Sequence, residues 1–166
     1  MASARILRLA PVLLFAASVA LAPSAAASSG PAVRGGGVVD GDPGTTSQLG
    51  FTATSSGGSF LCVMAGRSGK FRFGPWDNIQ QMHVQGRVTP GSLSISGGVA
   101  TFSGTATIHV VGTTSTGRLD MTLTGVPFTS TQTAGGAGVA WHRLDVSGVG
   151  TFGPALMKSG HITIWP

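Results

Sequence analysis

The side chains most able to do chemistry in this chain are four histidines, five aspartates and one cysteine. Nucleophilic catalysis needs a serine or cysteine beside a base that an acid orients. The sequence contains neither a G-x-S-x-G nor an S-x-x-K motif. Glycoside hydrolysis needs two facing carboxylates, and Asp120 and Asp145 fall on the polar side of period-two patterns, where surface residues are expected. We therefore predict no catalytic residue from the sequence.

The histidines also lack the spacing of a metal site. No H-x-x-x-H pattern and no closely spaced Cys/His pair is present, so the sequence predicts no metal and no cofactor. Three of them fall on polar positions of strand patterns: His83, His109 and His161. His142 instead shares the parity of Leu144 and Val146, which indicates either a buried, hydrogen-bonded core histidine or a strand bulge.

Cys62 is the single cysteine, so the chain cannot form an internal disulfide. It lies in the run Phe60-Leu61-Cys62-Val63-Met64, which is apolar at every position. Such a run indicates a strand covered on both faces. We expect a buried, unreactive thiol there.

Aromatic side chains offer the better case for binding. Trp76 follows the alternating run Lys70-Phe71-Arg72-Phe73, in which we expect the phenylalanines to fill the core and the bases to be solvated. An exposed tryptophan would give a platform for sugar rings or a lid over an apolar lumen. The candidate partner is therefore a glycan or a small apolar ligand, and the candidate binding residues are Trp76, Trp141, His142 and Trp165.

The charge pattern argues against nucleic acid as a partner. The formal net charge of +5 falls to +3 without Arg5 and Arg8, and the remaining bases are scattered from Arg34 to Lys158. The high isoelectric point of 11.2 reflects a shortage of acids. Nucleic-acid binders concentrate their bases on one face, and this chain shows no such run.

The N-terminal residues have the pattern of a secretory signal peptide. Arg5 and Arg8 precede an apolar run over residues 9–22, and Ala25 and Ala27 offer an A-x-A cleavage site. We predict a signal peptide at 1–27, a flexible Gly-rich leader at 28–37 and a single β domain at 38–166. The product is expected to be secreted, with no membrane anchor.

Composition and periodicity both predict an all-β fold. The chain has 27 glycines and only 9% charged residues, and its Thr and Val content suits pleated strands. Residues 100–111 alternate apolar and polar side chains, and Gly97-Gly98 supplies the turn of a hairpin with residues 93–96. Further strands are expected at 82–88, 119–123 and 161–165, the last of them closing the sheet, whereas residues 127–137 are the longest expected loop.

The short strands separated by Gly and Pro predict an antiparallel meander that closes as a small β-barrel of about eight strands, with a β-sandwich as the alternative. Gly86 and Gly104 favour the barrel, because inward glycines relieve crowding where a sheet coils sharply. A barrel of about eight strands can hold one small ligand in its lumen.

The motifs Val84-x-Gly86-x-Val88-Thr89, Leu93-x-Ile95-x-Gly97 and the run at 100–107 resemble those of small secreted β domains of unknown function from high-GC Gram-positive bacteria. These bacterial domains sometimes serve as accessory modules of larger exported proteins. An acidic loop usually follows these strands in that family, whereas this chain has Thr, Ser and Gly over residues 128–138. The family has no established catalytic residues, so the resemblance implies none here.

The primary functional hypothesis is a secreted, non-enzymatic β domain that binds an envelope or extracellular ligand or acts as a structural accessory. The alternative is a small extracellular hydrolase or isomerase that uses a histidine. That alternative requires a histidine within hydrogen-bond reach of an aspartate inside a concavity.

Overall fold

The computed structural model describes residues 30–41, 45–68 and 78–166. These residues form strands and turns, with no helix among them. The strands are β1 (Ala32–Asp40), β2 (Thr45–Thr54), β3 (Gly57–Ser68), β4 (Asn78–Val88), β5 (Ser94–Ser96), β6 (Val99–Thr114), β7 (Gly117–Thr133), β8 (Gly135–Gly136), β9 (Trp141–Val146) and β10 (Gly150–Trp165). The predicted signal peptide lies outside the described residues and stays a prediction.

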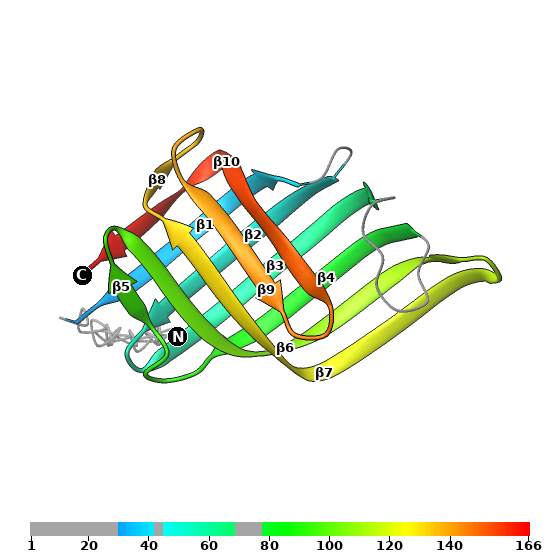
Figure 1. Cartoon of the computed structure of the whole chain (residues 1–166), viewed down its shortest axis with the longest axis horizontal. Helices are drawn as coiled ribbons and strands as arrows, with labels where there is room; N and C mark the ends of the chain where they lie inside the picture. The colour runs from blue at the N-terminus through cyan, green and yellow to red at the C-terminus, as the bar shows by residue number, and fades with distance from the viewer. Residues whose placement is uncertain (1–29, 42–44, 69–77) are drawn as a thin grey trace, which may run out of the picture.

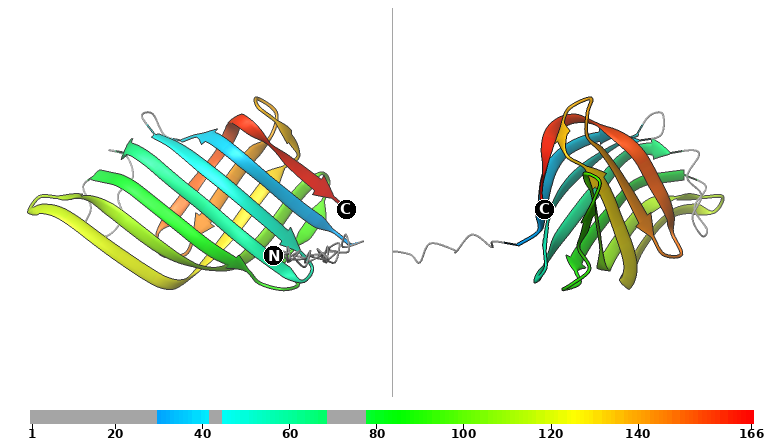
Figure 2. Two further views of the ribbon diagram at one scale, coloured as in Figure 1. Left: turned by 180° about the vertical axis from the view of Figure 1, so that it is seen from behind. Right: turned by 60° about the vertical axis from the view of Figure 1, so that its left-hand side comes forward.

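The strands form a closed antiparallel barrel. Its eight strands follow the order β1-β2-β3-β4-β6-β7-β9-β10, and β10 pairs back to β1 from Ala32 opposite Trp165 to Val39 opposite Met157. The short strands β5 and β8 pair with β6 and β10. Figures 1 and 2 show the sheet curling round on itself, with the β6–β7 hairpin projecting at one end. The predicted barrel is confirmed, and the sandwich alternative is wrong.

Strand β1 begins earlier than the sequence suggests. Residues 32–37 belong to the barrel wall, so a leader extending to residue 37 is wrong at its C-terminal part. The glycines read as flexible are needed for close packing. A Cβ at Gly35 would lie 2.8 Å from Ile162 Cγ1 and 2.9 Å from Phe51 Cζ. The absence of side chains therefore lets β1 pack against the core at the point where the barrel closes.

The expected hairpin and central strand are confirmed. β5 pairs with β6 through Gly97 and Gly98, both with positive φ. The expected loop at 127–137 is wrong, because residues up to Thr133 continue β7 and pair with β6 and β9. Threonines and serines are good strand residues when they line a solvated face, and Phe128, Ser130 and Gln132 point inward from this segment.

A bulge divides β6 and β7 into two halves. Between the pairs Ala106–Val126 and Ile108–Leu123, β7 carries one extra residue, and Gly125 there has a φ of 69°. The extra residue inverts the parity of β7. On the Gly117 side of the bulge, Leu119, Met121 and Leu123 face inward. Among the described strands, only β6 pairs with residues 117–127.

Glycines inside the strands make room for a core ring, as expected for a tightly coiled barrel. A Cβ at Gly86 would lie 2.5 Å from Phe128 Cε1, and one at Gly104 would lie 2.9 Å from the same atom.

The Cys62 strand, in contrast, is covered on one face only, because Leu61 is 41% exposed. The expectation of burial on both faces is wrong there. Neighbouring side chains of β3 alternate between the lumen and the outer wall.

Candidate functional site

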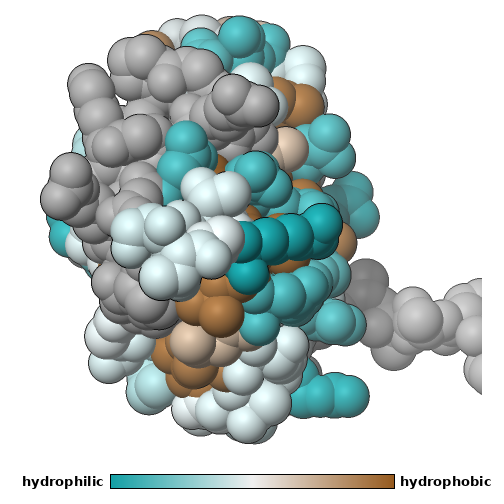
Figure 3. Space-filling view, turned by 90° about the vertical axis from the view of Figure 1, so that its right-hand side faces the viewer, coloured by the Kyte–Doolittle hydropathy of each residue, from teal (hydrophilic) through white to brown (hydrophobic). Residues whose placement is uncertain are grey.

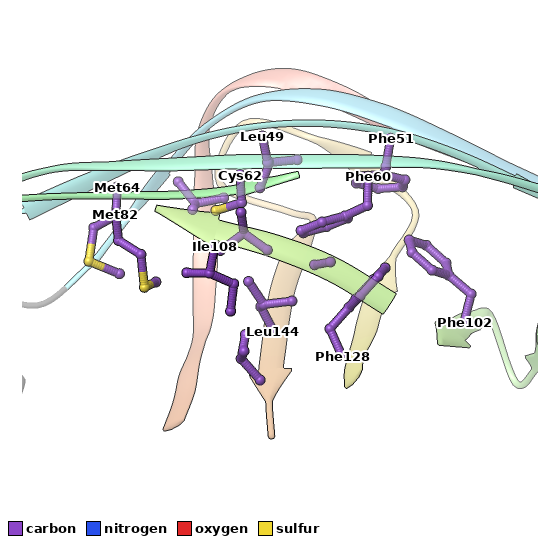
Figure 4. Close-up of a cluster of buried hydrophobic side chains, with 14 of the residues drawn as sticks. Leu49, Phe51, Phe60, Cys62, Met64, Met82, Phe102, Ile108, Phe128 and Leu144 are labelled. Carbon is purple, nitrogen blue, oxygen red and sulfur yellow. The ribbon is translucent and has the colours of Figure 1, made fainter. Parts of the chain in front are cut away.

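The barrel lumen has two chemically different ends. Figure 4 shows Met64 and Met82 on one side and the rings of Phe51, Phe60 and Phe102 on the other, with Cys62, Ile108 and Leu144 between them. The rings contact one another, for example Phe60 and Phe128 with centroids 5.0 Å apart. Side chains from opposite walls fill the aromatic end.

A cavity of about 490 Å³ lies beside this core. The lining side chains with almost no exposed surface are Val39, Thr45, Ser47, Cys62, Met64, His142 and Leu144. Asp40, Gly41 and residues 151–156 of β10 line the rest of the cavity. Among the described lining residues, Thr45, Ser47 and His142 are the buried polar ones.

The cavity lies where the barrel seam is interrupted. The pairing of β10 with β1 stops at Met157, and residues 150–156 pair with β9 alone among the described strands. A bulge between Phe152 and Ala155 interrupts even that pairing, and Pro154 in it has no N–H to donate. Residues on both sides of this interruption line the cavity, Asp40 and Gly41 on one side and residues 151–156 on the other. Figure 3, which faces the right-hand side of the view in Figure 1, shows a small patch of apolar residues among polar and neutral ones.

His142 is the polar centre of the lumen. Antiparallel pairing places it opposite Gln132 on β7, with Ser130 two residues further along the same inward face. The Ser130 hydroxyl donates to Gln132 Oε1 at 2.8 Å, and Ser130 Oγ lies 3.1 Å from His142 Nε2. All three side chains are buried. The prediction of a buried, hydrogen-bonded core histidine is confirmed, and the bulge alternative is wrong.

Aromatic rings hold the imidazole in place. The His142 ring stacks on Phe51 and Phe60, with centroid distances of 6.2 and 5.9 Å and interplanar angles of 23° and 18°. Burial lowers the pKa of His142 to about 4, because the imidazolium form loses its hydration. The ring is therefore neutral near pH 7.

Cys62 lines the same cavity and is unreactive by environment. Burial raises the pKa of its thiol to about 12, and a hydrogen bond with Ser47 opposes this rise only in part. A thiol in that state contains almost no thiolate at neutral pH. The prediction of a buried thiol is confirmed, and its contribution to the cavity is as a small apolar group.

The three predicted binding residues that the structure describes do not come together. His142 faces the lumen, whereas its neighbour Trp141 lies on the outer wall in a shallow groove with Arg143, Pro154 and Leu156. Trp165 is 40% exposed near the other end of β10, and the Arg34 guanidinium lies over its ring at 5.2 Å. Trp76 lies outside the described residues, as does the run at 70–73.

Two pairs of titratable groups lie on the outer wall. His109 Nε2 is 2.6 Å from Asp120 Oδ1, and both side chains are about half exposed. Asp145 bonds Arg143, whose guanidinium lowers the pKa of that carboxyl. Among the described residues no three His, Cys, Asp or Glu side chains are placed to hold a metal ion.

Sequence reasoning missed the partners of His142. Ser130 and Gln132 lie in the segment expected to be a loop, although their alternation with Thr129, Thr131 and Thr133 is a period-two signal. Ser47 also went unnoticed at the cavity wall, between the inward residues Thr45 and Leu49. Small polar residues can be assigned to the polar part of a lumen only when it is known which residues of the strand face inward.

No protein-family model, curated protein or solved structure matches the chain. Within the described ranges, no helix is long and apolar enough to cross a bilayer.

Proposed function

We propose that this chain is an exported, non-enzymatic β domain that binds a small, largely apolar extracellular or envelope ligand in the lumen of its barrel. The observation that carries the proposal is the cavity of about 490 Å³ that runs from the seam to Cys62, Leu144 and His142. Its volume falls within the range of about 300–1,000 Å³ that is typical of small-molecule sites. Export is supported by the N-terminal arginines and apolar run.

The lining sets the chemistry of the ligand. Met64, Leu144 and the uncharged Cys62 thiol present apolar surface to the cavity, and such surface contributes about 25 cal/mol per Å² removed from water. Among the described residues, the buried polar side chains of the lining are Thr45, Ser47 and His142, and Ser47 hydrogen-bonds Cys62. A mainly hydrocarbon molecule with one polar group fits this lining best.

Titration with the neutral fluorophore N-phenylnaphthylamine tests the proposal. The wild-type protein is expected to give saturable fluorescence enhancement. The cavity-filling variant Ser47→Phe is expected to lose this signal while it still unfolds cooperatively. Ser59→Phe is the matched control, because Ser59 is exposed on the outer face of the next strand. No saturable signal in wild type, or equal binding by folded Ser47→Phe, would reject binding in the lumen.

The hydrolase or isomerase alternative receives little support from the geometry. The contact between a described histidine and an aspartate, His109 with Asp120, lies on the outer wall and not in a cavity. His142 lines a cavity, but its partner is Ser130. With a pKa of about 4, His142 is a weak base, and efficient acid–base groups have pKa values near the working pH.

A glycan platform is the second candidate for binding. It is favoured by the outer-wall groove in which Trp141 lies beside Leu156, a residue 53% exposed. Sugar rings stack on such aromatic faces. Titration with soluble oligosaccharides, followed by tryptophan fluorescence in wild type and Trp141→Ala, distinguishes this surface from the lumen. Quenching that Trp141→Ala abolishes and Ser47→Phe preserves would favour the outer groove.

A further inference from the structure

We propose that the lumen selects ligands carrying a hydrogen-bond donor, a hydroxyl or an N–H group, over matched ethers and carboxylates, with His142 Nδ1 as the acceptor. This inference rests on the proposed binding in the lumen and adds the chemical class of the ligand. Nδ1 lies inside a buried site, and neither packing nor hydrogen bonding engages it.

The hydrogen bonds of Ser130 fix the tautomer of His142. A serine hydroxyl has one proton, and Ser130 donates it to Gln132 Oε1. His142 Nε2 lies 3.1 Å from the same oxygen, so Nε2 must carry the proton and donate it to Ser130. A neutral imidazole protonated at Nε2 has a lone pair at Nδ1. Nδ1 is therefore an acceptor.

That acceptor has no partner among the described residues. The hydrogen bond of His142 runs through Nε2 to Ser130, and His142 contributes to the cavity lining. Stacking on Phe51 and Phe60 holds the plane of the ring. A ligand donor placed at Nδ1 would therefore gain a hydrogen bond that no described side chain supplies, whereas an ether would not.

Ser47, Thr151 and Asp40, three further polar groups of the lining, are each engaged elsewhere. The Ser47 hydroxyl is engaged with Cys62, and Thr151 Oγ1 donates to Asp145. Asp40 is the one charged side chain among the described lining residues, and it pairs with Lys158 at 2.9 Å. A ligand carboxylate in this lumen would lose water, meet no lining cation and approach Asp40. Burial of an unpaired charge is strongly unfavourable.

Competition by three ligands with the same apolar chain tests the selection: decanol, decyl methyl ether and decanoate, each displacing N-phenylnaphthylamine at pH 7. Decanol is expected to bind about ten-fold more tightly than the ether and the carboxylate. In His142→Phe the alcohol and the ether are expected to bind equally. His161→Phe is the matched control, since His161 is exposed on the outer wall, and it should keep the preference.

The outcomes separate the two proposals. Equal binding of alcohol and ether by wild type, or tighter binding of the ether or the carboxylate, would overturn the selection while leaving lumen binding in place. Failure of all three ligands to displace the fluorophore would overturn both. A nitrogen NMR spectrum of wild-type protein labelled at the imidazole gives a readout that does not depend on any variant folding. It must show His142 protonated at Nε2, and protonation at Nδ1 instead would reject the inference.

Discussion

The neutral His142 ring makes the stability of the barrel depend on pH. Burial lowers the pKa of His142 from 6.5 to about 4, so below pH 6.5 the unfolded chain binds a proton that the folded one does not. Stability is therefore lost as the pH falls through this window, with the loss complete near the folded pKa. We expect the free energy of unfolding to fall by about 3 kcal/mol from this group between pH 7 and pH 4.

Urea unfolding of wild type and His142→Gln at several pH values measures this effect. The difference between the two stability curves isolates His142, because Asp145, whose pKa Arg143 lowers, titrates in both proteins. The difference should shrink by about 3 kcal/mol on acidification. Gln85→Asn, a change at an exposed position of the outer wall, should parallel wild type. A difference that does not vary with pH would contradict burial of a neutral imidazole.

At the scale of elements, the bulge at Gly125 determines which β7 side chains enter the lumen. The φ of 69° at Gly125 is favourable for glycine and strained for alanine. A Cβ there would meet no atom within 4 Å, so any loss of stability in Gly125→Ala comes from the backbone. We expect this substitution to destabilise the protein by about 1 kcal/mol in urea unfolding.

Gly50→Ala is the matched control for the bulge. Gly50 also lies in a strand with no atom within 4 Å of an added Cβ, but its φ is not in the left-handed region. The substitution should be neutral or slightly stabilising, because alanine loses less conformational entropy than glycine on folding. Equal stability of the two variants would show that the backbone of the bulge accommodates alanine without strain.

The same bulge explains why some strands and inward residues could be predicted from the sequence and others could not. Strands with unbroken alternation, such as β6, were predicted from their parity, and so was the inward position of His142. Parity cannot be carried across Gly125, where β7 gains one residue. The half of β7 that is rich in Thr and Ser therefore resembled a loop. For this reason the inward positions of Ser130 and Gln132 were not predicted. The glycines of β1 resembled a leader because their use, close packing against Phe51 and Ile162, depends on contacts distant in sequence.

On the scale of the whole molecule, the seam between β1 and β10 both closes the barrel and opens the cavity. Pairing from Ala32–Trp165 to Val39–Met157 joins the two ends of the described chain. Where that pairing ends, the lining passes from β1 to residues 151–156 of β10. One seam thus holds the fold together along half its length and borders the cavity along the rest.

The seam should also be the last part of the barrel to form. Most other neighbours in the sheet are joined by short connections, whereas β1 and β10 must meet across the whole chain, and closing a long loop delays such contacts in folding. Ile162→Ala removes a fully buried side chain at the seam and should cost about 2–4 kcal/mol. Because contacts formed after the transition state affect mainly unfolding, this loss should appear as faster unfolding.

Stopped-flow tryptophan fluorescence over a range of urea concentrations measures both rates. Val84→Ala is the comparison, since Val84 is equally buried but lies in the β3–β4–β6 meander, where neighbouring strands pair locally. Val84→Ala should slow refolding, whereas Ile162→Ala should leave the refolding rate close to that of wild type. If Ile162→Ala slowed refolding as much as Val84→Ala, the seam would already be closed in the transition state, and folding would begin from the paired ends of the chain.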